Sequence, residues 1–112
     1  MKQIWITKAG LPEVLSVRDS SDPPLRGGEV RIRVKAAGIN FADILGRMGI
    51  YPDSPGIPYV PGYEIAGVVE ELGQGATNLQ EGDNVLALTR FGGYSEVVSV
   101  PHKQVFRRLD WM

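Results

Sequence analysis

The sequence predicts a mainly β domain in which short strands are joined by turns. Fourteen glycines and eight prolines make up about a fifth of the 112 residues, well above the ~12% that these two residue types average in proteins. They are spread along the chain, which favours many short strands over long helices or a disordered tail. The clearest strand, Glu29–Ala36, alternates polar and apolar residues, as a strand with one buried face does.

The remaining strands are predicted from apolar runs that are bounded by turn residues. Gly10 and Pro12 close the first run, and the Gly27-Gly28 turn precedes Glu29–Ala36. Gly67 interrupts a later run and indicates close approach to another backbone. The other predicted strands are Gln3–Thr7, Val14–Arg18, Ile65–Leu72, Val85–Leu88, Tyr94–Val100 and Gln104–Phe106.

One short helix is predicted after Gly38, where the apolar period changes from two residues to that of a helix. Asn40 suits its N-cap and Gly49 its C-terminal end. A proline then stands at every third position from Pro52 to Pro61, which predicts a stiff, extended crossing segment of polyproline type. The apolar residues that share one face of the helix are Phe41, Ile44, Leu45 and Met48.

Composition and charge argue against several classes of partner. The 12 basic and 13 acidic residues are mixed along the chain, so the net charge of −1 favours neither nucleic acid nor an anionic membrane. The absence of cysteine excludes disulfides and thiolate metal sites and fits a reducing cytosol. No apolar run approaches the ~18 residues of a membrane span, and the N-terminus has no signal-peptide block. We therefore expect a cytoplasmic protein without a membrane span.

Sequence motifs predict neither a nucleotide loop nor a metal site. Residues 73–78, Gly-Gln-Gly-Ala-Thr-Asn, half-match a dinucleotide loop, but no helical pattern follows, so a surface turn is expected. His102 is the only histidine and has no thiolate to join it. Asp43, Asp53 and Glu64 could gather around a hard cation, although nothing in their spacing requires it.

Asn40 and three tyrosines have both a structural and a functional interpretation. Asn40 is a helix cap, an amide that donates to a substrate oxygen or a cofactor, or both, because a cap on a helix that faces a cleft is also well held. Tyr51 is either a packing aromatic or a phenol that donates to a carbonyl; with a usual pKa of about 10, a phenol is a donor and not a base at neutral pH. Tyr59 and Tyr63 carry the same ambiguity.

Two carboxylates next to these residues are interpreted as structural on the residues alone. Asp43 lies within the predicted helix, where it is either solvated or paired with Arg47 four positions later. Glu64 opens a predicted strand, and we expect its side chain to be buried with a partner.

Three motifs follow one another through the middle of the chain. Residues 37–43 are Ala-Gly-Ile-Asn-Phe-Ala-Asp, residues 49–52 are Gly-Ile-Tyr-Pro, and residues 61–69 are Pro-Gly-Tyr-Glu-Ile-Ala-Gly-Val-Val. In this order they resemble the N-terminal, GroES-like domain of the medium-chain dehydrogenase/reductase superfamily, and most of all its zinc-free quinone oxidoreductases. The resemblance covers nearly all of residues 1–112. It implies a GroES-like, partly open β-barrel with one short helix.

The resemblance also implies that no zinc is bound. In the zinc-dependent alcohol dehydrogenases of this superfamily, a cysteine stands where Asn40 is and a histidine where Tyr63 is. An amide and a phenol do not replace that pair as zinc ligands. The four-cysteine lobe of those enzymes would fall near Thr89–Gly92, where this chain passes directly from one strand to the next.

In the quinone oxidoreductase branch NADPH gives a hydride to a quinone or an enone, and negative charge collects on the carbonyl oxygen. By resemblance, Asn40 and Tyr51 are the catalytic residues, and Tyr51 and Tyr63 line the substrate. Asn40 and Asp43 are the residues expected at the cofactor, with Asp43 supporting the loop from behind.

The resemblance further implies that the superfamily's Rossmann cofactor domain lies outside residues 1–112. We expect this chain alone to be inactive, to bind no NADPH, and to expose apolar surface that favours a homodimer or poor solubility. Two alternatives stay open: a non-catalytic protein-interaction module on a GroES-like scaffold, and a reductase domain cut from a larger multi-domain enzyme.

Overall fold

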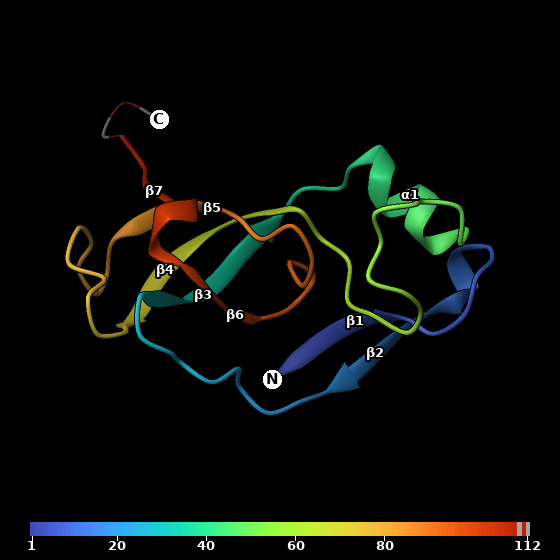
Figure 1. Cartoon of the computed structure of the whole chain (residues 1–112), viewed down its shortest axis with the longest axis horizontal. Helices are drawn as coiled ribbons and strands as arrows, with labels where there is room; N and C mark the ends of the chain where they lie inside the picture. The colour runs from blue at the N-terminus through green and yellow to red at the C-terminus, as the bar shows by residue number, and fades with distance from the viewer. Residues whose placement is uncertain (110, 112) are drawn as a thin grey trace.

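The computed structural model describes residues 1–109 and 111, which form two antiparallel sheets and one α-helix (Figure 1). The small sheet pairs β1 (Lys2–Ile6) with β2 (Leu15–Asp19). The large sheet has the strand order β6-β3-β4-β5-β7 and does not close into a barrel over these residues. Its strands are β3 (Glu29–Ala37), β4 (Glu64–Leu72), β5 (Asn84–Leu88), β6 (Val97–Pro101) and β7 (Val105–Arg107), and the helix is α1 (Phe41–Arg47).

The predicted fold class, mainly β with one short helix, is confirmed. All but one of the predicted strands lie within one residue of the observed bounds. The exception is the strand predicted from Tyr94, which begins at Val97. The N–H of Tyr94 donates to the carbonyl of Pro61 at 2.9 Å, and Ser95 forms an isolated bridge with Gln3. These two residues therefore tie loops together and do not extend the ladder of β6.

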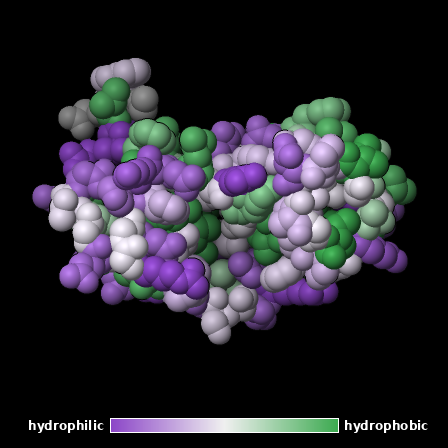
Figure 2. Space-filling view, viewed as in Figure 1, coloured by the Kyte–Doolittle hydropathy of each residue, from purple (hydrophilic) through white to green (hydrophobic). Residues whose placement is uncertain are grey.

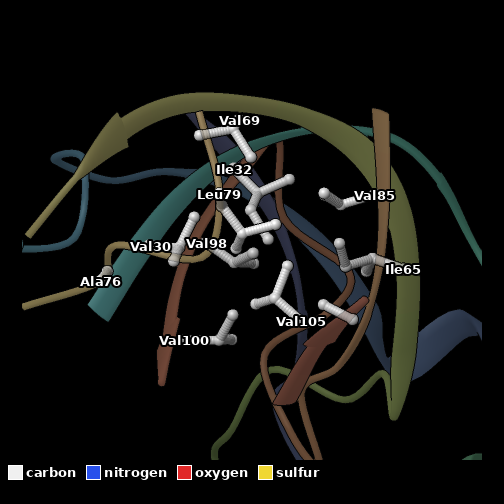
Figure 3. Packing of buried hydrophobic residues seen from close by; sticks show 11 residues of the cluster. Val30, Ile32, Ile65, Val69, Ala76, Leu79, Val85, Val98, Val100 and Val105 are labelled. Atoms are coloured by element: carbon white, nitrogen blue, oxygen red, sulfur yellow. The ribbon is translucent and has the colours of Figure 1, made fainter. Parts of the chain in front are cut away.

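The hydrophobic core lies on one face of the large sheet, and the alternation of β3 explains why. Val30 and Ile32 are completely buried, whereas Arg33 faces solvent. Burying one large aliphatic side chain contributes about 1.5–3 kcal/mol, so this face supplies most of the driving force for folding. Figure 3 shows aliphatic side chains from all five strands pointing toward one another; the cluster contains Val30, Ile32, Ile65, Val69, Ala76, Leu79, Val85, Ala87, Val98, Val100 and Val105.

Gly67 allows β3 and β4 to approach closely, as its place in the sequence predicted. A Cβ atom at this position would overlap the carbonyl oxygen of Arg33 and stand 2.7 Å from Cγ2 of Ile32. Both neighbours belong to the rigid centre of the sheet, so neither can move aside cheaply. The residue is therefore required by packing and not by a turn.

Helix α1 forms as predicted, but it does not bury its apolar face. Phe41 is 72% exposed and Met48 is 47% exposed, whereas Asp43 and Gly46 are buried. Figure 2 shows hydrophobic residues over the end of the molecule that carries α1. The helix turns its small and acidic face inward because Asp43 accepts hydrogen bonds there.

No helix among the described residues is long and apolar enough to cross a bilayer.

The proline-rich segment is not the continuous extended crossing that the spacing predicted. It turns directly after Tyr51, whose carbonyl accepts the N–H of Ser54 at 3.2 Å. Further on, Tyr59 exchanges backbone hydrogen bonds with Ile6 of β1. The segment therefore folds back and fastens the small sheet to the loop that carries the Pro61-Gly62-Tyr63 motif.

Replacing Gly67 with alanine should lower the free energy of unfolding by about 2 kcal/mol, because overpacking a rigid core typically costs 1–3 kcal/mol. Gly27→Ala is the matched control, since a Cβ at Gly27 meets nothing closer than a backbone oxygen at 3.8 Å. Urea denaturation of both variants measures the difference. Equal stability of the two variants would show that β3 and β4 can separate at no cost.

Candidate functional site

The carboxylate of Asp43 is the centre of the candidate site. It is 5% exposed and accepts three hydrogen bonds, from the backbone N–H of Asn40 at 2.9 Å, from that of Gly62 at 3.2 Å, and from the hydroxyl of Tyr94 at 3.1 Å. The residues alone predict an Asp43 that is either solvated or paired with Arg47. The structure shows that this prediction is wrong. Its position joins the start of α1 to two loops that are far apart in the sequence.

Asn40 holds the N-terminus of α1 and also keeps a free amide donor. It forms a capping box with Asp43, as expected for an N-cap. Its Nδ2 atom is buried and has no hydrogen-bond partner within the described part of the chain. A buried donor left unpaired costs about 1–3 kcal/mol, so such a group is an unusual feature that a ligand oxygen would relieve.

Tyr63 stands in an aromatic cluster with Tyr51 and Phe91. The rings of Tyr51 and Tyr63 meet edge to face at 6.3 Å, and Phe91 lies 5.5 Å from Tyr63. Such contacts hold the rings in fixed orientations. The hydroxyl of Tyr63 is buried and, among residues 1–109 and 111, accepts and donates no hydrogen bond. It is a second polar group without a protein partner near Asp43.

Burial and negative charge act together on the tyrosines around Asp43. Burial raises the pKa of Tyr63 above its ordinary value, and the Tyr51 hydroxyl and the Asp43 carboxylate raise it further. The pKa of Tyr94 is raised by burial and by the adjacent Asp43 carboxylate. The pKa of Tyr59 is raised for the same two reasons. These phenols therefore stay protonated at neutral pH and can act as hydrogen-bond donors.

The loops that carry Tyr63 and Tyr94 cross at two glycines. The N–H of Gly93 donates to the carbonyl of Gly62 at 3.1 Å. Gly62 has a φ of +115°, and a Cβ there would stand 2.7 Å from the Cα of Gly93. Because neither residue has a side chain, the two backbones are in contact, which fixes the loop that carries Tyr63 against the loop that carries Tyr94.

Tyr94 is the site residue that the sequence did not reveal. The sequence predicts a strand from Tyr94, whereas in the structure the Tyr94 hydroxyl donates a hydrogen bond to Asp43. No periodic signal marks it, because its contact with Asp43 joins residues 51 positions apart in the sequence.

Glu64 is exposed, contrary to the expectation that it would be buried. It begins β4 opposite Leu88, on the face of the sheet that turns away from the core. Only the next residue, Ile65, points into the core. Over the described residues no three His, Asp or Glu side chains gather closely enough to hold a metal ion, so Asp43, Asp53 and Glu64 form no cation cluster.

Two shallow depressions of about 540 Å³ and 470 Å³ flank the C-terminal end of β3, at Ala36 and Ala37. Asn40, Tyr51 and Tyr63 line neither of them. Tyr94 lines the first of them and, together with Asp43, a smaller depression of about 280 Å³, so the part of the candidate site next to a hollow is the Asp43–Tyr94 pair.

Comparison with known proteins identifies relatives of this arrangement. Residues 26–110 match the family described as alcohol dehydrogenase GroES-like domain. The chain is 47% identical over 85 residues to the synaptic vesicle membrane protein VAT-1 homolog of Rattus norvegicus, which covers 75% of this chain and 21% of that protein. It is 36% identical over 99 residues to quinone oxidoreductase-like protein 2 of Bos taurus, covering 88% of this chain and 28% of that protein.

Solved structures give the same result. The crystal structure of the human VAT-1 homolog-like protein matches with a TM-score of 0.95 at 35% identity, over 100% of this chain and 36% of that one. Quinone oxidoreductase of Escherichia coli, complexed with NADPH, matches with a TM-score of 0.92 at 31% identity, over 100% of this chain and 34% of that one. These matches confirm the resemblance seen in the motifs. The chain spans about a fifth to a third of its relatives' length.

Replacing Asp43 with alanine should lower the free energy of unfolding by about 3 kcal/mol or more, because three donors lose their acceptor. Tyr94→Phe removes only one of these bonds and should cost about 1 kcal/mol. The exposed Asp53→Ala is the control and should change stability by less than about 0.5 kcal/mol. Chemical denaturation gives all three values, and an Asp43 variant as stable as the Asp53 variant would contradict this account.

Stability should fall as the pH rises above about 10, because the folded state keeps tyrosine protons that the unfolded state releases near that pH. The sign follows from the raised folded-state pKa values of Tyr59, Tyr63 and Tyr94. Urea midpoints between about pH 8 and pH 11 measure the effect, and Tyr94→Phe should reduce the slope. A slope that Tyr94→Phe leaves unchanged would show that Tyr94 does not contribute to the loss of stability.

Proposed function

Because the chain belongs to the alcohol dehydrogenase GroES-like domain family, we propose that it is the substrate-side domain of a zinc-independent quinone or enone oxidoreductase. The observation that carries this proposal is that Nδ2 of Asn40 and the hydroxyl of Tyr63, two of the buried polar atoms, have no hydrogen-bond partner among residues 1–109 and 111. Asn40 and Tyr63 also occupy the two places where zinc-dependent members of the superfamily carry cysteine and histidine. An amide and a phenol suit a carbonyl oxygen better than a zinc ion.

NADPH is the cofactor that we propose for the whole protein. Relatives solved with NADPH support this choice, among them the quinone oxidoreductase of Escherichia coli. The residues present fit such a group, because the amide of Asn40, which has no partner in the described part of the chain, can donate to a carbonyl oxygen of cofactor or substrate. When bound, NADPH supplies a hydride to the substrate. We propose that the other residues of the cofactor site belong to the rest of the longer protein.

The residues of this chain would act on the carbonyl oxygen of the substrate. Negative charge grows on that oxygen during reduction, and a donor fixed beside it lowers the barrier. We assign this role to Asn40 and Tyr51, and we place Tyr63 against the substrate, where its ring also fixes that of Tyr51. Asp43 is assigned the role of a positioning residue at the cofactor side, since it holds the backbone of Asn40 through its carboxylate.

The chain alone is proposed to be inactive. Asn40, Tyr51 and Tyr63 line neither of the two depressions at the end of β3, so the described residues form no closed cleft around these side chains. Hydride transfer needs a dry cleft in which donor and acceptor are held together. The longer relatives have several times as many residues with which to close such a cleft. A reductase domain within a larger multi-domain enzyme would meet the same requirement.

A second candidate is a non-catalytic interaction module on the same scaffold. The observation that favours it is the exposed apolar cluster over and around α1, which includes Leu11, Phe41, Met48 and Ile50. Relatives of this chain are named synaptic vesicle membrane proteins. In that case the cluster would bind another protein, and no turnover of NADPH would accompany it. The cytoplasmic location expected from the composition stays a prediction.

The proposed function is tested by NADPH consumption with a panel of quinones and enones. We expect none with residues 1–112 alone and measurable consumption with the longest open reading frame that contains them. In the longer protein, Tyr51→Phe should lower kcat/KM about tenfold, equivalent to the ~1.4 kcal/mol of one hydrogen bond to developing charge. Tyr59→Phe is the control, because Tyr59 is buried against Gly46 and Phe91 and is assigned no role.

Failure of the longer protein to oxidise NADPH with any member of the panel would reject the enzyme and favour the interaction module. Consumption that Tyr51→Phe leaves unchanged would keep the enzyme and remove Tyr51 from its donor role.

A further inference from the structure

Arg90 follows β5 and has a left-handed backbone that residues with a side chain usually avoid. Its φ is +65°, and among the described residues no other non-glycine residue has a positive φ. The N–H of Phe91 donates to the carbonyl of Thr89 at 2.7 Å, so Arg90 is the central residue of a γ-turn. A γ-turn with a positive φ at its centre is rare and strained. An arginine here therefore carries a conformational cost that glycine would avoid.

The strained turn is fixed against the loop that carries Tyr63. The N–H groups of Thr89 and Arg90 both donate to the carbonyl of Tyr63, at 2.7 Å and 3.2 Å. Strained residues persist where the surrounding structure determines their conformation, and they cluster at sites that bind ligands. The conformation of Arg90 therefore indicates a function for its side chain.

The guanidinium of Arg90 lies over an aromatic ring of the candidate site. Its Cζ atom is 5.7 Å from the centroid of the Phe91 ring, which is within the reach of a cation–π contact. Phe91 in turn lies 5.5 Å from Tyr63, whose ring contacts that of Tyr51. A positive charge therefore stands at the edge of the aromatic cluster that contains both tyrosines.

The described part of the chain supplies no carboxylate to Arg90. Arg31, Arg33 and Arg107 each pair with an acidic side chain, whereas no ion pair within residues 1–109 and 111 involves Arg90. The buried carboxylate of the site, Asp43, already accepts three hydrogen bonds from other groups. A guanidinium is planar, weakly hydrated and able to bind a carboxylate through two parallel N–H donors. An anion brought by a ligand would complete this geometry.

We propose that Arg90 binds the carboxylate of a substrate whose carbonyl oxygen lies at Asn40 and Tyr51. This inference rests on the proposed function, because that function places the substrate against Tyr63. The substrate class is then a quinone or an enone that also carries a carboxylate. One guanidinium matches the charge and the two oxygens of one such group. The rings of Phe91 and Tyr63 pack against the body of the substrate between its two ends.

Two acceptors that differ in charge test the proposal: a benzoquinone with a propanoate side chain and the methyl ester of the same compound. The protein is the longest open reading frame that contains residues 1–112, and kcat/KM is measured with NADPH. Arg90→Asn removes the charge and keeps the turn, because asparagine tolerates left-handed backbone. It should lower kcat/KM for the acid about tenfold, as loss of a hydrogen-bonded ion pair does, and leave kcat/KM for the ester and KM for NADPH unchanged. Arg90→Lys keeps the charge without the planar fork and should recover part of the loss.

Arg18→Asn is the matched control for these measurements. Arg18 is also exposed, and its Cζ atom lies 5.7 Å from the ring of Trp5. Both residues belong to the small sheet and are not part of the candidate site. This variant should leave the ratio of the two kcat/KM values unchanged.

Equilibrium dialysis of the two quinones against the same proteins, without NADPH, separates this inference from the proposed function. If neither quinone is reduced, the proposed function fails, but tighter binding of the acid that Arg90→Asn abolishes still supports the Arg90 site. An acid that binds no more tightly than its ester overturns the proposal. An acid-to-ester ratio of kcat/KM that Arg90→Asn leaves unchanged overturns it equally. A raised KM for NADPH would assign Arg90 to the phosphates of the cofactor, and this result also rejects the proposal.

Discussion

The hydrogen bonds to the buried carboxylate of Asp43 hold the candidate site together. An ionisable group at this depth persists only when donors satisfy it, and Asn40, Gly62 and Tyr94 supply them from three segments. Each donor brings one part of the site with it: the start of α1, the loop that carries Tyr63, and the loop after Phe91. None of these three segments is held by the strand pairing of the large sheet. The bonds to Asp43 therefore fix their positions relative to one another.

The large sheet could be predicted from the sequence because local signals and packing agree there. Polar and apolar residues alternate along β3, and Val30 and Ile32 enter the core as that pattern requires. The face of α1 and the burial of Glu64 could not be predicted in the same way. The i, i+3, i+4 spacing predicts a helix but does not predict which face of the helix is buried. In α1 the buried face is the one that carries Asp43. Glu64 is the first residue of its strand, and the side chain that points inward is that of the next residue, Ile65.

The candidate site could be predicted only in part. Asn40 and Asp43 stand in one helical turn, so their contact is local and visible in the sequence. Tyr94 lies 51 positions from Asp43, and only the crossing of Gly62 and Gly93 brings it there. Contacts of this kind depend on the complete fold, and a single sequence carries no periodic signal for them. The aromatic contact of Tyr51 with Tyr63 depends in the same way on the turn that follows Tyr51.

The buried amide of Asn40, which has no hydrogen-bond partner within the described residues, costs the domain stability. Proteins commonly give up some stability where a group is kept ready for a ligand. Any selection for heat resistance alone would favour residues that cap α1 without leaving a buried donor empty. Under the proposed function, a substitution at position 40 that removes the buried donor would stabilise the fold and weaken recognition of a substrate oxygen together.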